Sequence, residues 1–339
     1  MPKGAGWLSQ VWMIQKNTEA INRQPKLQKN KSARMSKTTL WKFDKIEAVR
    51  RKEVFNMNNN RIAKIVTVIE FIETHLTEKI DLDSIADAVH YSKYHLHRVF
   101  TNTVGLTIHD YVQRRQLTEA AKLLVFSEKP IIEIAAVAGY ETQQAFTNIF
   151  TAMYKQPPNQ YRENEKFYPL QLKFRLGGDY GMLNSKEIDK WHITFATQED
   201  IPSWMDLVRL VIDGFPHLQE DEYILELKRR INSKQALISR DGNIAVGIML
   251  FSYKTGSIDF MGTHPLYRNK GLPKAFLDKV MGELIKEKEI SITTYREGDK
   301  ADTGHRKLIQ ELGFAEAELL IEFGYPTQRF ILPKEAAHE

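Results

Sequence analysis

The chain contains no cysteine. This absence excludes disulfide bonds, catalytic thiols and cysteine-ligated zinc or iron–sulfur centres, and it fits a reducing compartment. Long apolar runs are also missing, because no stretch approaches the roughly 18 apolar residues that a membrane-spanning helix needs. The N-terminal residues lack the sustained apolar segment of a secretory signal. We therefore expect a cytoplasmic protein with no membrane partner.

Positive charge is scarce outside the N-terminal segment. Residues 1–56 hold 13 Lys and Arg against 4 Asp and Glu, and the rest of the chain holds 35 against 39. The net charge of +5 therefore gives no general argument for nucleic-acid binding. Residues 1–59 are polar, basic and weakly periodic, which predicts a disordered tail. A non-specific nucleic-acid arm is one interpretation of this tail, but helical periodicity directly after Met57 favours a flexible leader, or sequence upstream of the real start.

Hydrophobic periodicity divides the remaining sequence into two regions. Apolar residues at helical spacing predict an all-α domain over 60–165. Residues 166–190 mix proline, glycine and aromatic residues, which is typical of a partly ordered linker. From 191 to 335, strand-like alternation, a hairpin turn at Asp241-Gly242 and helical segments predict an α/β (α+β) domain. The expected fold class is therefore multidomain, all-α followed by α/β.

The helical region contains an internal repeat. Residues 85–100 read IADAVHYSKYHLHRVF and match residues 134–150, IAAVAGYETQQAFTNIF, with one extra residue after the tyrosine of the second copy. Each copy predicts a short helix, a tight turn and a second helix, which is the helix-turn-helix plan. Ser92 and Thr142 stand where the N-caps of the second helices belong.

The second helix of each copy has an apolar face and an opposite polar face. Apolar residues recur at helical spacing from Leu96 in the first copy and from Phe146 in the second, so these faces point inward. The outward side chains carry amide, hydroxyl, imidazole and cationic groups that can read base edges. The predicted DNA-binding residues are Lys93, Tyr94, His97, Arg98, Gln143, Gln144, Thr147 and Asn148.

A solvated helix face is the alternative interpretation for either copy alone. Two such units in register instead favour DNA binding, because they suit successive major-groove segments of double-stranded DNA, about 34–36 Å apart. A metal site is not expected, because His95 and His97 are two residues apart and point to different sides of a helix.

The repeat resembles the DNA-binding unit of the AraC/XylS transcriptional regulators. In that family a long helix, here 107–126, joins two helix-turn-helix subdomains. The resemblance covers about 60–165 and is carried by Ile134-Ala135, Gly139-Tyr140, Phe146, Phe150, Pro158 and Tyr161-Arg162. It implies base contacts by the outward residues of both second helices. Asn148 and Thr151 stand where the family often has basic residues, so we expect fewer phosphate contacts and a weaker salt dependence.

A second resemblance covers roughly 191–333. Residues 268–273, RNKGLP, follow a predicted strand, open a predicted helix and resemble the Arg/Gln-x-x-Gly-x-Gly/Ala loop of GNAT-type N-acetyltransferases. In that family the loop N–H groups and the helix N-terminus hold the diphosphate of acetyl-CoA. A basic surface turn is the alternative for so short a motif. The resemblance implies acetyl-CoA contacts by Met261, Thr263, Arg268, Asn269, Lys270, Gly271 and Lys274.

Departures from the GNAT pattern leave catalysis open. Pro273 has no N–H at the last loop position, and Ile309 stands where the family often carries a tyrosine that protonates the departing thiolate. His305, one turn earlier, is the candidate substitute acid, and Asp259 and Asp302 are candidate bases. For each of these three residues a structural role is the competing interpretation.

Two functions follow from these resemblances. The leading hypothesis is a sequence-specific, DNA-binding transcription regulator whose GNAT-like domain senses an acyl-CoA or other small ligand, or acetylates an amine. The alternative is an active N-acetyltransferase, acting on a small-molecule amine, whose helix-turn-helix half targets or regulates it. A helical scaffold without a DNA role is a third, weaker interpretation.

Overall fold

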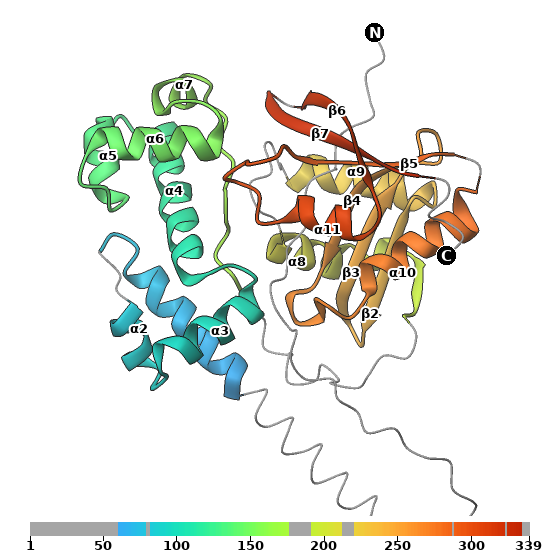
Figure 1. Cartoon of the computed structure of the whole chain (residues 1–339), viewed down its shortest axis with the longest axis horizontal. Coiled ribbons are helices and arrows are strands. Elements are labelled where there is room, and N and C mark those ends of the chain that lie inside the picture. Colours follow the sequence, from blue (N-terminus) through green and yellow to red (C-terminus); the bar gives the residue numbers. More distant parts are fainter. Residues whose placement is uncertain are drawn as a thin grey trace, which may run out of the picture.

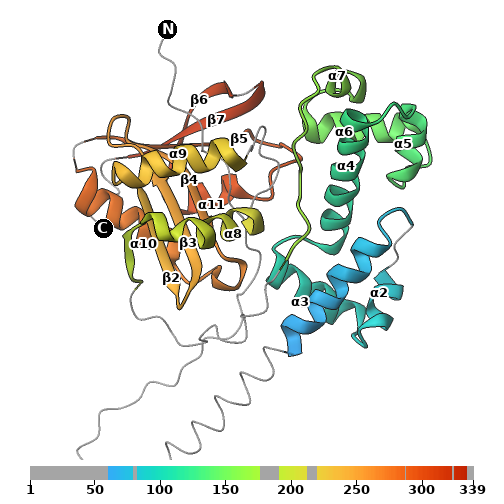
Figure 2. The ribbon, with the colours of Figure 1, turned by 180° about the vertical axis from the view of Figure 1, so that it is seen from behind.

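The computed structural model divides into a helical half, residues 60–175, and a sheet half, residues 191–333, which lie side by side (Figures 1 and 2). The predicted tail over 1–59 and residues 176–190 of the predicted linker lie outside the described residues. The described residues are 60–78, 82–175, 191–211, 220–286, 288–322 and 324–333.

The helical half contains the two predicted helix-turn-helix units. After a helix that includes residues 60–74, the first unit consists of α2 (Leu82–Ala88) and α3 (Lys93–Val104). The long helix α4 (Ile108–Phe126) leads to the second unit, α5 (Ile131–Val137) and α6 (Gln143–Tyr154). The short helix α7 (Pro158–Glu163) packs against α4 and α6. The internal repeat therefore corresponds to two structural units, as expected.

The sheet half is built on one seven-stranded sheet in the order β1-β2-β3-β4-β5-β7-β6. Neighbouring strands are antiparallel except β4 and β5, which are parallel. The predicted hairpin forms around Gly242, where φ is +58°. The strands are β1 (Ile193–Phe195), β2 (Ala236–Asp241), β3 (Ile244–Phe251), β4 (Ser257–Thr263), β5 (Ile290–Tyr295), β6 (Ala315–Glu322) and β7 (Tyr325–Leu332).

Helices cover both faces of this sheet. On one face lie α8 (Ile201–Val211) and α9 (Glu220–Asn232), two helices that the sequence patterns above did not indicate. On the other face lie α10 (Leu272–Lys279) and α11 (His305–Glu311), and α10 continues as a π-helical turn over Val280–Leu284. The predicted fold class, a tandem helix-turn-helix region followed by an α/β region, is confirmed. Among the described helices, none is both long and apolar enough to cross a membrane.

The two halves share apolar contacts. Tyr295, Ala301 and Tyr325 of the sheet half belong to the same buried cluster as Phe146 and Phe150 of the second helix-turn-helix unit. The core of the first unit is likewise continuous with the apolar layer beneath α8 and α9. Burial across both boundaries favours a defined arrangement of the halves over free rotation.

A buried ion pair holds α4 against the first helix, which includes residues 60–74. The guanidinium of Arg115 donates to both carboxylate oxygens of Glu73, at 2.7 and 2.8 Å, and the Tyr111 hydroxyl donates to the same carboxylate at 2.8 Å. The side chains of Glu73 and Arg115 are 9% and 8% exposed. Burial alone would lower the pKa of Arg115, but the hydrogen bonds and charge of Glu73 raise it, so the guanidinium stays charged.

Removing the Glu73 charge should destabilise the helical half strongly. The variant Glu73→Gln leaves the buried Arg115 with only the half-exposed Glu119, at 3.1 Å, as counter-charge, so we expect a loss of about 3 kcal/mol in unfolding free energy. Glu70→Gln, on the same helix, is the matched control, because Glu70 pairs with Lys173 at 55% exposure and should cost at most about 1 kcal/mol. Urea denaturation followed by circular dichroism measures both, and equal losses would contradict the assignment.

Candidate nucleic-acid interface and anion-binding loop

The ends of α3 are fixed by its own sequence. The Ser92 hydroxyl accepts the N–H of His95 at 3.3 Å, and the helix ends at Gly105, whose φ of +88° suits glycine. Leu96 and Phe100 are completely buried. Their burial turns the opposite face of α3 outward, as the periodicity predicts.

The outward face of α3 presents four side chains to solvent. Tyr94 is 77% exposed, and the Arg98 guanidinium lies 5.9 Å from the centre of its ring. His97 is exposed as well, whereas Lys93 forms an ion pair with Asp83 of α2. Tyr94, His97 and Arg98 are therefore available to contact DNA. The charge of Lys93 is partly neutralised by Asp83.

The helix α6 repeats this design. The Thr142 hydroxyl accepts the N–H of Ala145 at 3.1 Å, and Lys155 ends the helix at φ +60°. Gln143 is exposed, and the amide of Gln144 donates to the Asn148 side chain at 2.8 Å. Thr147 and Thr151, also on this face, are half-buried.

The distance between the two units depends on α4. Its 19 residues span about 28 Å, which approaches one turn of B-DNA. The Thr107 hydroxyl caps α4 by accepting the Asp110 N–H at 3.0 Å and donates to the Asp110 carboxylate at 2.7 Å. This reciprocal cap sets where α4 begins after the turn at Gly105.

The RNKGLP motif forms the loop between β4 and α10. Asn269 and Gly271 adopt left-handed conformations, with φ of +67° and +72°, and Gly271 is the N-cap of α10. A Cβ added to Gly271 would meet nothing within 4 Å, so this helix start is open. The Lys270 carbonyl accepts from the Trp191 indole at 2.9 Å, and Lys274 is exposed. The loop therefore combines an open helix N-terminus with nearby cations.

The parallel strands β4 and β5 separate toward this loop. They pair only at Ser257 with Ser291 and at Ile258 with Ile292. Beyond that point their facing edges diverge, so the main chain of β4 toward Thr263 is not paired to β5. Met261 is buried in the core below α10, whereas Thr263 is half-buried at the end of β4. Because its side chain is buried, Met261 could contact a bound acetyl-CoA only through its main chain.

Comparison with known proteins separates the two halves. A sequence profile described as a helix-turn-helix domain matches residues 85–164. The regulator YbfP of Bacillus subtilis is 40% identical over 94 residues, or 28% of this chain and 32% of YbfP. The probable transcription factor PqrA of Proteus vulgaris is 39% identical over 99 residues, or 29% of this chain and 81% of PqrA. The chain belongs to the AraC/XylS family of transcriptional regulators.

Membership in this family rests on the helical half alone. The chain spans about a third of YbfP, so the similarity does not extend to the remainder of that relative. A solved acetyltransferase structure of the GNAT family, from Bacillus cereus, covers 43% of this chain and 98% of its own, at 16% identity and a TM-score of 0.34. We call residues 191–333 the GNAT-like domain, after the sequence resemblance carried by the RNKGLP loop.

The two predicted catalytic residues are not brought together. Asp259 points to the α9 side of the sheet, where its carboxylate lies 2.8 Å from Arg230 and accepts from Ser257 at 2.6 Å. His305 begins α11 on the other face, with its Nε2 atom 3.1 Å from the Thr303 hydroxyl. Both are almost fully buried. Burial raises the pKa of Asp259, although Arg230 opposes that shift.

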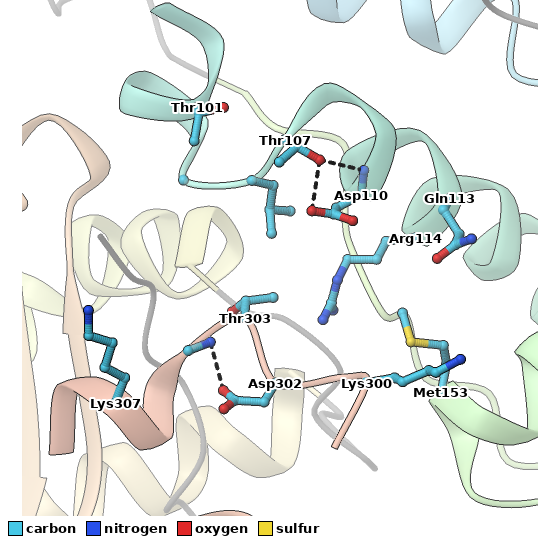
Figure 3. Close-up of a pocket in the computed structure, with 13 residues that line it drawn as sticks. Thr101, Thr107, Asp110, Gln113, Arg114, Met153, Lys300, Asp302, Thr303 and Lys307 are labelled. Carbon is cyan, nitrogen blue, oxygen red and sulfur yellow. Dashed lines mark hydrogen bonds between the residues drawn. The ribbon is translucent and has the colours of Figure 1, made fainter. Parts of the chain in front are cut away.

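A cleft of about 350 Å³ lies between the two halves of the regulator. Figure 3 shows Arg114 reaching from α4 toward the loop that carries Asp302 and Thr303. Its guanidinium donates to the carbonyl of Ala301 in that loop and to the Leu170 carbonyl at 3.3 Å. Of the residues predicted from sequence, only the candidate base Asp302 lines this cleft. The cleft brings distant segments together, so no local pattern could have indicated it.

His264 lies between β4 and the loop over residues 268–271. It is 1% exposed, and its Nδ1 atom accepts the N–H of Leu266 at 3.2 Å. Burial, followed by the nearby charge of Arg268, lowers the pKa of His264 to about 3. The imidazole is therefore neutral in the folded protein at physiological pH.

Mild acid should destabilise the fold through His264. The unfolded chain binds this proton below about pH 6.5, whereas the folded chain does so only near pH 3. Stability is therefore complete above pH 6.5 and falls as pH drops. Between pH 7 and 5.5 we expect His264 to remove about 1 kcal/mol of unfolding free energy, measured by urea denaturation.

The variant His264→Asn should lack this pH-dependent loss. Its side-chain oxygen can still accept from Leu266, but it does not titrate. The same substitution at exposed His192 is the matched control and should keep the wild-type slope. A wild-type slope in His264→Asn would show that another group is responsible.

Proposed function

We propose that α3 and α6 of this AraC-type regulator read two successive major-groove segments of one DNA duplex. The observation that supports this most directly is the matched exposure of both polar faces, on two helices of 12 residues joined by α4. Arg98 offers a bidentate donor suited to guanine, and Gln143 an amide suited to adenine.

Base contacts carry more of this binding than phosphate contacts do. Residues 60–165 contain 11 Lys and Arg against 13 Asp and Glu, so the helical region has no positive surplus. Lys93 is already paired with Asp83, which removes one more phosphate partner. We expect modest affinity for unrelated sequences and a shallow dependence on salt concentration.

For the GNAT-like domain we propose binding of an acyl-CoA. Support comes from the unpaired edges of β4 and β5, which open toward the loop over 268–271 and the N-terminus of α10. The extended, amide-containing arm of CoA that ends in the thiol can hydrogen-bond to such strand edges, as a peptide does when it adds to a sheet. The diphosphate suits the helix N-terminus and its cations.

Sensing is the role that the chemistry of this domain favours. Ile309, at the position where the GNAT resemblance expects a proton donor, is 1% exposed and apolar. His305 and Asp259 lie on opposite faces of the sheet, so they cannot act as a pair on one substrate. A domain that binds acyl-CoA without turnover would report its concentration to the DNA-binding half.

An amine acetyltransferase is the second candidate, and one observation favours it. A hollow of about 290 Å³ on the sheet includes Asp259, Glu318 and Glu322 among its lining residues. Arg329 also lines it and pairs with Glu318 at 2.9 Å. Asp259 is paired with Arg230, so Glu322 is the carboxylate of this hollow that suits a cationic amine. Turnover of acetyl-CoA with a panel of primary amines and polyamines would support this function, and binding without turnover would support the sensor.

The DNA-reading faces can be tested with single substitutions. Arg98→Ala and Gln143→Ala should each cost about 1–3 kcal/mol of specific binding and relax base preference at one position. Binding is measured on duplexes selected from a random pool with the wild-type protein. Arg229→Ala on α9 and Gln160→Ala on α7, both exposed, are controls that should bind normally. Unchanged site discrimination in Arg98→Ala and Gln143→Ala would refute the proposed faces.

The acyl-CoA site can be tested at two glycines with equal surroundings. Gly271 and Gly242 both have positive φ and nothing within 4 Å of an added Cβ, so Asp introduces similar backbone strain at each. Gly271→Asp places a negative charge at the proposed diphosphate site and should weaken acetyl-CoA binding about tenfold or more. Gly242→Asp should leave it unchanged. Calorimetric titration that finds equal affinities for both variants would exclude the loop as the site.

A further inference from the structure

The loops that follow β4 and β5 both contact the helical half. Arg268, after β4, packs against Gly105 at the end of α3. After β5, Ala301 accepts from Arg114 of α4, and Asp299 lies 2.7 Å from the Lys155 ammonium at the end of α6. Because β4 and β5 are parallel, both loops leave the same edge of the sheet. The helical half therefore lies next to the end of the sheet where β4 and β5 separate.

The contact at Gly105 is tight. A Cβ built on Gly105 would lie only 2.6 Å from the Arg268 Cζ atom, so the guanidinium occupies the space that a side chain would need. The Nε and Nη1 atoms of Arg268 are buried there. Gly105 also lines the cleft of Figure 3, together with Thr303 and Gly304 from the loop before α11.

Arg268 thus has two competing positions. In the docked arrangement its guanidinium lies against the turn between α3 and α4. To clamp a diphosphate at the start of α10, it must turn away from Gly105 toward the loop. Since a guanidinium binds an anion best through parallel donors in one plane, it cannot fill both positions at full strength.

We propose that acyl-CoA and the C-terminal turn of α3 compete for Arg268, so that acyl-CoA binding releases the first helix-turn-helix unit from the GNAT-like domain. This inference rests on the proposed acyl-CoA site and adds its regulation. Thermodynamic linkage makes the effect reciprocal: DNA and acyl-CoA change each other's affinity by the same factor if DNA distinguishes the docked from the released unit.

The test uses a substitution that blocks docking and leaves the loop intact. Gly105→Asn adds a side chain where Arg268 packs, and Asn tolerates the left-handed conformation. The equivalent position of the second unit is Lys155, at φ +60°, so a non-glycine residue is compatible with this helix end. Gly139→Asn is the matched control, because φ there is +79° and the nearest atom is the flexible end of Gln116.

Calorimetric titration of the full chain with acetyl-CoA should show about tenfold tighter binding by Gly105→Asn than by wild type. Gly139→Asn should match wild type. Equal affinities of wild type and Gly105→Asn would overturn the competition while leaving the proposed acyl-CoA site in place. Absence of binding to every variant would overturn both.

A second measurement needs no variant. In the wild-type protein, saturating acetyl-CoA should increase amide hydrogen exchange over residues 101–108, which include the contact with Arg268. Exchange over residues 143–150 of α6, which do not line the cleft shared by Gly105 and Met153, serves as the internal reference. Unchanged protection of 101–108 with acetyl-CoA bound would overturn the inference.

Discussion

Glu73 and Arg115 face each other where water is nearly excluded, and the architecture of the helical half depends on that pair. Arg115 donates twice to Glu73 and also to the Gln171 carbonyl at 3.1 Å, so one guanidinium joins three segments of the chain. A buried charge without its partner lowers the stability of the folded state. We therefore expect α4 to pack in this position only when the pair is formed. The relative placement of the two helix-turn-helix units, and hence DNA recognition, follows from that packing.

Local sequence was sufficient to predict α3, α6 and their faces. Caps such as Ser92 and Thr142 act within three residues, and apolar periodicity acts within a few helical turns. The helices α8 and α9 went unpredicted although their apolar faces are buried against the sheet. Their sequences have clear helical signals, such as acidic residues in the first turn of α9. The long-range contacts of Arg268 and Arg114 have no local signal at all.

In the GNAT-like domain, the features proposed to bind a ligand and those needed for catalysis depend on the sequence in different ways. The separation of β4 and β5 and the open start of α10 are main-chain features, and they tolerate many side chains. Proton transfer instead requires particular groups in reach of one reacting atom. Sequence could suggest His305 and Asp259 by type, but only the sheet decides that they face opposite layers.

The two recognition helices end differently, and this makes their attachment to the GNAT-like domain unequal. Gly105 has no side chain, so its contact with the Arg268 guanidinium is one of close packing. The Lys155–Asp299 pair is an electrostatic link with a partly exposed ammonium, and counter-ions screen it. Rising ionic strength would therefore weaken this polar contact of the second unit, whereas the apolar cluster of Phe146, Phe150 and Tyr325 would still join that unit to the sheet half.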